Sequence, residues 1–217
     1  MQCNWVEMDV EVVSQTGPDQ QLKAKAALLA KASGVTRLVK LSCDKDPTWS
    51  LKLLQRAAPT VQRLSVYFAL KTHLSVVHTM PRLTRLNVSG HFAQLGRPLE
   101  LPSSLPLRPA GLQWLSVGVI ARTTTQSLLR ANGRTLEEVE LWIGTAGNKC
   151  WPDSCGDLAW LLQQSGLRAI KRIVLRRYKR CSHEPAACSK QLAEVRRVLP
   201  SAEVKCGKCD YAREDEV

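Results

Sequence analysis

Two cysteines late in the chain have the spacing of a metal-binding knuckle. In Cys206-Gly-Lys-Cys209 the thiols are three residues apart, and the glycine allows backbone amides to turn toward sulfur. Cys181, His183 and Cys188 lie upstream, and stacked repeats would bring their loop close to the knuckle. We therefore expect a structural zinc ion held by Cys206, Cys209 and Cys181 together with Cys188, or with His183 in its place.

Disulfides and plain reduced thiols are the two alternatives for the eight cysteines. Cys150 and Cys155 could pair or stay free, and Cys3 and Cys43 could be small apolar fillers. The chain shows no signal-peptide pattern, and no stretch approaches the roughly 18 apolar residues of a membrane helix. We therefore expect a cytoplasmic or nuclear protein with no membrane partner, in which thiols or metal ligands are commoner than disulfides. No other cofactor is expected.

The histidines do not complete a catalytic constellation. His73 and His78 fall in or near a helix and are expected to face solvent or to sit at its end, and the serines and cysteines near them lack a third member. His91 and His183 are the other two histidines. Residues 144–149 only faintly resemble a phosphate-binding loop, because no hydroxyl follows the lysine. The sequence thus favours a protein that is not an enzyme.

One six-residue pattern, apolar-x-x-apolar-x-apolar, recurs along the chain. Its end alternates apolar and polar residues, which is typical of a strand with one buried face. Copies that start at residues 61, 83, 112 and 136 are 22, 29 and 24 residues apart, close to the roughly 20–29 residues of leucine-rich repeats. The expected strands begin at Trp5, Leu38, Val61, Leu83, Leu112, Leu136 and Ile170, and a last strand runs from Ala202 to Cys206.

Helical segments lie between these copies. Residues 51–57, 126–130, 158–162 and 192–199 place apolar side chains three or four positions apart. A strand followed by a helix cannot bury its apolar face alone, so neighbouring repeats must stack. We predict an α/β leucine-rich-repeat solenoid, a short horseshoe with parallel strands on its concave face and helices on its convex face. It would form a single domain over residues 1–217 with about seven irregular repeats and a C-terminal cap over residues 181–217.

A proline-rich stretch interrupts the pattern. Four prolines between residues 98 and 109 exclude both a helix and regular ladder hydrogen bonds. Residues 89–110 are therefore predicted to be an extended insertion, which could be a docking loop or a tolerated length change.

The chain resembles the leucine-rich-repeat superfamily over essentially its whole length. Its irregular repeat lengths and the run at residues 129–141 resemble F-box/leucine-rich-repeat proteins. In that family the repeats hold a substrate while an F-box binds a ubiquitin-ligase scaffold. Repeat-like sequence begins here at Trp5 and no F-box helices are visible, so the chain could be a truncated product, a fragment or a repeat-only adaptor. The resemblance implies partner recognition.

The pattern also predicts which side chains face a partner. Its apolar positions face the core, so the third and fifth residues and the one that follows the motif would lie on the concave surface. Trp114 and Trp142, expected on adjacent strands, would be either the main anchors or rings that lie flat on neighbouring aliphatic side chains. Lys40 would continue a basic column with Arg63 and Arg85. The expected partner-binding residues are Arg63, Tyr67, Arg85, Trp114, Glu138, Glu140, Trp142, Arg172 and Arg176.

The net charge of +12 and a pI of about 9.6 fit an acidic partner, or only a solvated surface. A protein partner is the leading prediction, and a basic RNA- or DNA-binding scaffold is the alternative, because basic residues gather between residues 168 and 180. Glu138 and Glu140 would interrupt the continuous positive surface that nucleic acid needs.

Overall fold

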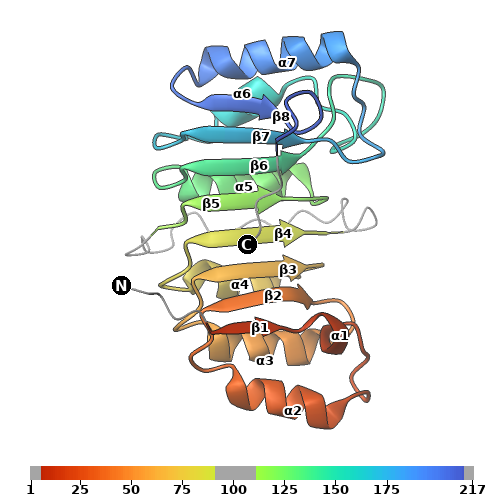
Figure 1. Cartoon of the computed structure of the whole chain (residues 1–217), viewed down its shortest axis with the longest axis vertical. Coiled ribbons are helices and arrows are strands. Elements are labelled where there is room, and N and C mark those ends of the chain that lie inside the picture. The colour runs from red at the N-terminus through yellow and green to blue at the C-terminus, as the bar shows by residue number, and fades with distance from the viewer. Residues whose placement is uncertain (1–5, 91–110, 213–217) are drawn as a thin grey trace. The chain divides into compact units, whose positions relative to one another are not determined.

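The computed structural model describes residues 6–90 and 111–212, which form two compact units (Figure 1). The first unit comprises residues 6–90 with residues 111 and 112, and the second comprises residues 113–212. Apart from Ser89 and Gly90, the predicted insertion at 89–110 lies outside the described residues, as do Cys3 and Trp5. The strands that the pattern predicts are distributed over the two units.

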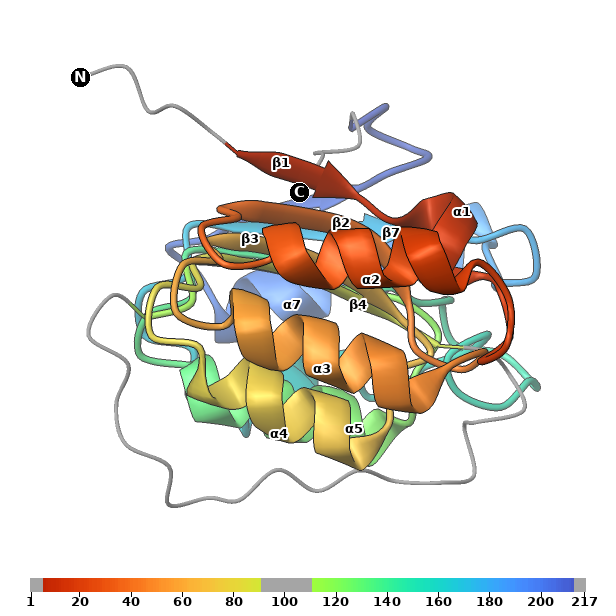
Figure 2. The same ribbon diagram turned by 90° about the horizontal axis from the view of Figure 1, so that it is seen from below.

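Within its described residues, the first unit has four parallel strands in chain order. They are β1 (Glu7–Asp9), β2 (Arg37–Ser42), β3 (Arg63–Tyr67) and β4 (Arg85–Ser89). The helices are α1 (Glu11–Ser14), α2 (Leu22–Lys31), α3 (Pro47–Ala57) and α4 (Lys71–Thr79). Helices α2, α3 and α4 lie on one side of these strands (Figure 2).

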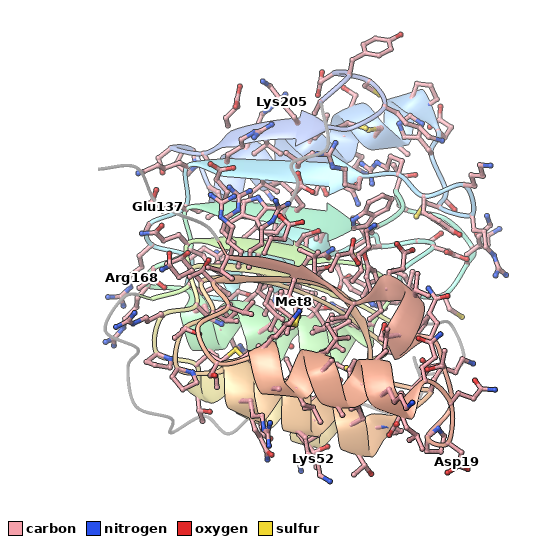
Figure 3. The ribbon with its side chains drawn as sticks, turned by 60° about the horizontal axis from the view of Figure 1, so that its bottom comes forward. Met8, Asp19, Lys52, Glu137, Arg168 and Lys205 are labelled. Atoms are coloured by element: carbon pink, nitrogen blue, oxygen red, sulfur yellow. The ribbon has the colours of Figure 1, made fainter. Side chains whose placement is uncertain are left out.

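Helix α3 shows how the sequence produces this layer. The Asp46 carboxylate accepts a hydrogen bond from the Trp49 amide, and Pro47 occupies the first turn, where no backbone donor is needed. Leu53 and Leu54 are fully buried, whereas Lys52 points away from the strands (Figure 3). Burial of this apolar face holds the helix against the sheet.

Strand β2 contains an irregularity that the sequence did not reveal. Its register with β3 shifts between Leu38 and Leu41, and Lys40 adopts the left-handed backbone conformation with a φ of 58°. Arg37 rather than Lys40 is therefore aligned with Arg63, and the predicted column of Lys40, Arg63 and Arg85 is wrong. The Lys40 ammonium instead lies 3.2 Å from Asp9 and 2.7 Å from Glu11.

The second unit repeats the arrangement within the part of the chain described. Its parallel strands are β5 (Trp114–Val117), β6 (Glu138–Trp142), β7 (Arg172–Arg176) and β8 (Glu203–Cys206), again in chain order. Its helices are α5 (Arg122–Asn132), α6 (Leu158–Gln163) and α7 (Pro185–Val198). The predicted α/β architecture of parallel strands alternating with helices is confirmed. None of the described helices has the length and apolar character needed to cross a membrane.

Candidate metal centre and strand surface

Four side chains of the second unit converge at the carboxyl ends of β7 and β8. Their ligand atoms all lie within 4.8 Å of one another. The His183 Nε2 atom is 3.5 Å from the Cys206 sulfur and 3.3 Å from the Cys209 sulfur, and the Cys209 and Cys188 sulfurs are 4.0 Å apart. Thiolates and imidazole are the ligands that zinc prefers in structural sites. The group is therefore a candidate metal centre.

The knuckle is held in place by a tight turn after β8. The Cys206 amide donates to the Asp210 carboxylate at 2.7 Å, and the Asp210 amide donates to the Cys206 carbonyl at 2.9 Å. The Gly207 amide donates to the Leu175 carbonyl of β7, and a side chain at Gly207 would lie 3.3 Å from Cδ of Arg176. The glycine of the knuckle therefore allows the turn to pack closely against β7.

Hydrogen bonds from neighbouring segments position His183. The adjacent residue, Ser182, accepts from the Thr145 amide at 2.8 Å and donates its own amide to the Asp153 carbonyl at 2.7 Å. Cys188 lies in the first turn of α7, where the Glu184 carboxylate accepts hydrogen bonds from two amides at 3.1 and 2.7 Å. The loop and the helix start are thus both held by hydrogen bonds within the unit.

A buried arginine lies beside the group. The Arg177 side chain is 7% exposed, and its Nη2 atom is 3.4 Å from the Cys188 sulfur and 2.8 Å from the Gln191 amide oxygen. Its Nη1 atom donates to the Ile143 carbonyl at 2.6 Å. Gln191 in turn donates to the carbonyls of Gly144 and Cys155. This network links the metal-ligand group to the interior of the unit.

The surroundings shift the pKa values of these ligand groups in different directions. Burial raises the pKa of Cys206, but the Cys209 amide, the Arg177 guanidinium and the Lys208 amide outweigh burial, so that this pKa is lowered overall. Burial, and then the neighbouring Cys206, raise the pKa of Cys209. Burial, with Arg177 and Lys208, lowers the pKa of His183 and so favours the neutral imidazole, which is the form that binds a metal.

The structure differs from the expected ligand set at one position. Cys181 lies outside the group, and its place is taken by His183, which was expected only as a substitute for Cys188. Cys181 is buried, and this burial raises the pKa of its thiol. Cys150 and Cys155 are free thiols, and Cys43 is a buried thiol in the core of the first unit.

On the first unit, three arginines form a row across neighbouring strands. Arg37 is aligned with Arg63, and Arg63 with Arg85, while Glu7 begins the row and its carboxylate lies 2.7 Å from Arg37. Burial, and then the charges of Arg85 and Arg37, lower the pKa of the Arg63 guanidinium. All three arginines are half-buried, and we call them the arginine row. Tyr67, also half-buried, ends β3 on the same face.

The corresponding row of the second unit alternates in charge. Glu138 is aligned with Arg172, and Arg172 with Glu203, so that one arginine lies between two acids. Its Nη1 atom is 3.5 Å from Glu138 and its Nε atom 3.9 Å from Glu203. Trp114 begins this row, but it is only 3% exposed.

Trp114, Glu140 and Arg176 were predicted to lie on the concave surface, and this prediction is wrong because all three are buried. The Arg176 guanidinium contacts both Glu140 carboxylate oxygens, at 2.6 and 3.3 Å, which makes a buried ion pair between β6 and β7. Trp142 does remain partly exposed and packs edge-to-face on Tyr178, with ring centroids 6.4 Å apart. Trp142 lies four residues beyond Glu138, the partner of Trp114, or about 13 Å along the strand. The two tryptophans are thus not neighbours.

His73 and His78 lie in the first and the last turn of α4, so the expected placement at a helix end is confirmed and the expected exposure to solvent is not. His73 is fully buried and His78 is 9% exposed, so neither faces solvent. The His73 Nε2 atom lies 2.9 Å from the Ser50 hydroxyl and 3.2 Å from the Pro47 carbonyl. Ser50 is fully buried as well, which leaves no room for a substrate beside this serine–histidine pair.

Comparisons with protein-family models, with curated proteins and with solved structures found no match for this chain. The arguments for function therefore depend on the geometry of its own residues.

Proposed function

We propose that this chain is a recognition module that binds an acidic segment of a protein partner on the strand surface of its first unit. In this proposal the chain is a leucine-rich-repeat protein of the cytoplasm or nucleus that acts by binding rather than by catalysis. The arginine row is the observation that supports it most directly. Three arginines lie at aligned positions of adjacent strands, whose backbones are about 4.8 Å apart, and so bring positively charged side chains to one small surface.

Arginine suits this role because its planar guanidinium group binds carboxylates through two parallel hydrogen bonds. Tyr67 adds a half-buried ring with a polar tip on the same strand as Arg63, and tyrosine and arginine are enriched at interface hot spots. Burial, and then the charges of Arg85 and Arg37, lower the pKa of Arg63, and an acidic partner would relieve the repulsion among these charges. A partner carboxylate is thus favoured over an apolar ligand.

The nucleic-acid alternative has less support. It relied on the basic residues between 168 and 180, but Arg176 and Arg177 are buried and bonded inside the second unit. Arg172 lies between two glutamates. These contacts interrupt the positive surface that a phosphate backbone would require.

The test is capture of partners from nuclease-treated cell extract. The bait is the whole chain, the double variant Arg63→Ser/Arg85→Ser, or the control Arg134→Ser/Arg168→Ser. The control removes the same charge from exposed positions of the second unit. We expect proteins retained by the wild type and the control to be lost by the double variant. A purified partner should bind the double variant at least about tenfold more weakly, which corresponds to about 1.4 kcal/mol.

Three outcomes would count against the proposal or part of it. Equal capture by all three baits would overturn the role of the arginine row. Loss of all binding after nuclease treatment, with a steep log-linear salt dependence before it, would favour nucleic acid instead. If no ubiquitin-ligase scaffold is recovered, the adaptor role that the F-box/leucine-rich-repeat resemblance implies is removed, while recognition itself stands.

A further inference from the structure

We infer that the second unit binds one zinc ion, and that this ion fastens β8 and α7 to the loop that follows β7. The four ligands are His183, Cys188, Cys206 and Cys209. This inference is independent of the proposed binding function, because it concerns a different set of residues.

The spacing of the ligand atoms matches a tetrahedron around zinc. With zinc–sulfur bonds of about 2.3 Å and zinc–nitrogen bonds of about 2.05 Å, neighbouring ligand atoms should be about 3.8 Å apart for sulfur–sulfur and about 3.6 Å for sulfur–nitrogen. The observed distances are 4.0 Å for Cys188 to Cys209, and 3.3 and 3.5 Å for His183 to the two sulfurs. Small movements would complete the coordination.

The chemistry of the donors identifies the metal and its role. Three sulfurs and one imidazole suit zinc, whereas calcium and magnesium require oxygen ligands. Four protein ligands leave no open position for water or substrate, so the site would be structural. The ligands come from a loop, a helix start and a strand end, which the metal would hold together.

The buried charge of Arg177 provides an independent argument. Zinc with three thiolates and a neutral histidine carries a net charge of about −1. Among the residues that the structure describes, Arg177 forms no ion pair with a carboxylate, and its neutral partners are the Ile143 carbonyl and the Gln191 amide. Its contact with Cys188 at 3.4 Å would therefore give this buried cation a counter-charge once the site is loaded.

A disulfide explains the arrangement less well. A Cys188–Cys209 bond would involve two of the four groups and give no reason for Cys206 and His183 to converge on them.

The first experiment measures metal in the whole chain, purified with a tag that contains no histidine. We expect one zinc ion per chain and little iron, copper or nickel. Removal of zinc with a chelator and addition of cobalt should give the visible absorption of tetrahedral cobalt together with sulfur-to-cobalt charge transfer. Absence of metal binding, a different native metal, or a Cys188–Cys209 disulfide found by mass spectrometry would each overturn the inference.

Single substitutions test the ligand set. Cys209→Ser should lose zinc, and His183→Cys should retain it, because four thiolates also form a structural site. Cys181→Ser and Cys150→Ser are the matched controls, since both thiols lie outside the group. Zinc loss in Cys181→Ser, with retention in Cys209→Ser, would disprove this assignment. The cobalt spectrum of the wild type decides the matter even if a variant fails to fold.

Arg177→Gln tests the charge argument. We expect it to retain the ligands but to bind zinc about 10–100-fold more weakly in competition with a chelator, as for other residues that support metal ligands. Unchanged zinc affinity would remove Arg177 from the site. The exposed Lys179→Gln is the control for loss of a nearby positive charge.

Discussion

The two units share an arrangement of strands and helices but distribute their charges differently. In the first unit, three arginines follow one another across β2, β3 and β4. In the second unit, Arg172 stands between Glu138 and Glu203. The same position of the repeat is therefore arginine three times in succession in the first unit, whereas it alternates in charge in the second.

Each unit also contains a buried ion pair among its described residues, but the two pairs have different cations. In the first unit, the Lys25 ammonium on α2 lies 2.7 Å from the Asp46 carboxylate, and the residues are 3% and 6% exposed. In the second, Arg176 and Glu140 join β7 to β6. Lysine can release its proton when it is buried alone, whereas arginine cannot. The pair of the second unit should therefore be the less tolerant of change.

The largest effect is expected for Glu140→Gln. The substitution leaves the charge of Arg176 buried beside a neutral group, which should cost about 3–5 kcal/mol of unfolding free energy. Chemical denaturation measures the loss, and hydrogen exchange should locate it in β6 and β7.

The double variant Glu140→Met/Arg176→Leu is the control, because it removes both charges. It should be more stable than Glu140→Gln. If the two are equally unstable, lost packing rather than unpaired charge explains the effect.

A smaller loss is expected for Asp46→Asn in the first unit. Asparagine can still cap α3, and the Lys25 ammonium keeps its hydrogen bonds to the Thr16 and Gly17 carbonyls, so we expect a loss of about 1–3 kcal/mol. Trp49 is a local probe, since the Lys25 ammonium lies 5.8 Å from its ring. A loss equal to that of Glu140→Gln would remove the distinction between the two pairs.

The Lys25–Asp46 ion pair should also make the stability of the first unit sensitive to acid. Burial raises the pKa of Asp46, but hydrogen bonds from Lys25 and the Trp49 amide outweigh it, so the folded pKa lies below the usual 3.8. The stabilisation is thus complete above pH 3.8 and is lost as the pH falls through the folded value. Asp46→Asn should remove this part of the acid transition in Trp49 fluorescence.

The smallest effects should come from exchanging the two charge patterns. Arg63→Glu creates an alternating row in the first unit and should stabilise it by about 0.5 kcal/mol, while Arg172→Glu places three acids in a row and should destabilise the second unit by about 0.5–1 kcal/mol. Thermal unfolding at low salt measures both.

High salt is the control, because it should reduce both effects by screening. Arg63→Glu should also abolish capture of the proposed partner while it increases stability. If Arg63→Glu is more stable and still captures the partner, the arginine row is not the surface that binds it.

The strands could be predicted because period and alternation are local properties of the sequence. The register of β2 could not, because the start of the pattern fits two alignments. The four residues Val35-Thr-Arg37-Leu38 match the start of the neighbouring copies, but the complete six-residue pattern fits only the copy that begins at Leu38, because Lys40 would take the last apolar position of the other alignment. The bulge at Lys40 makes both Leu38 and Leu41 buried residues. Arg37, Arg63 and Arg85 each stand directly before a leucine of the pattern, and this shared position could have revealed the arginine row.

The metal-ligand group was predicted in part. The knuckle and Cys188 were recognised from residue type and spacing, and His183 was expected as a substitute. The choice between Cys181 and His183 depends on how Ser182 is anchored, which involves Thr145 and Asp153, 37 and 29 residues earlier in the chain. The burial of Glu140 and Arg176 was missed for a related reason. The exposure of a strand residue depends on its neighbours as well as on which face it occupies.

The order of the strands has a consequence for how the second unit acquires its structure during synthesis. Each paired strand there contacts the next strand along the chain, so contacts form between segments made one after another. Cys206 and Cys209 follow β5 to β7 in the chain, and the ligand group is complete only when β8 has docked. With zinc as the ligand, metal capture would mark the final step of assembly, and a stalled or misfolded second unit would be recognisable by its failure to take up the ion.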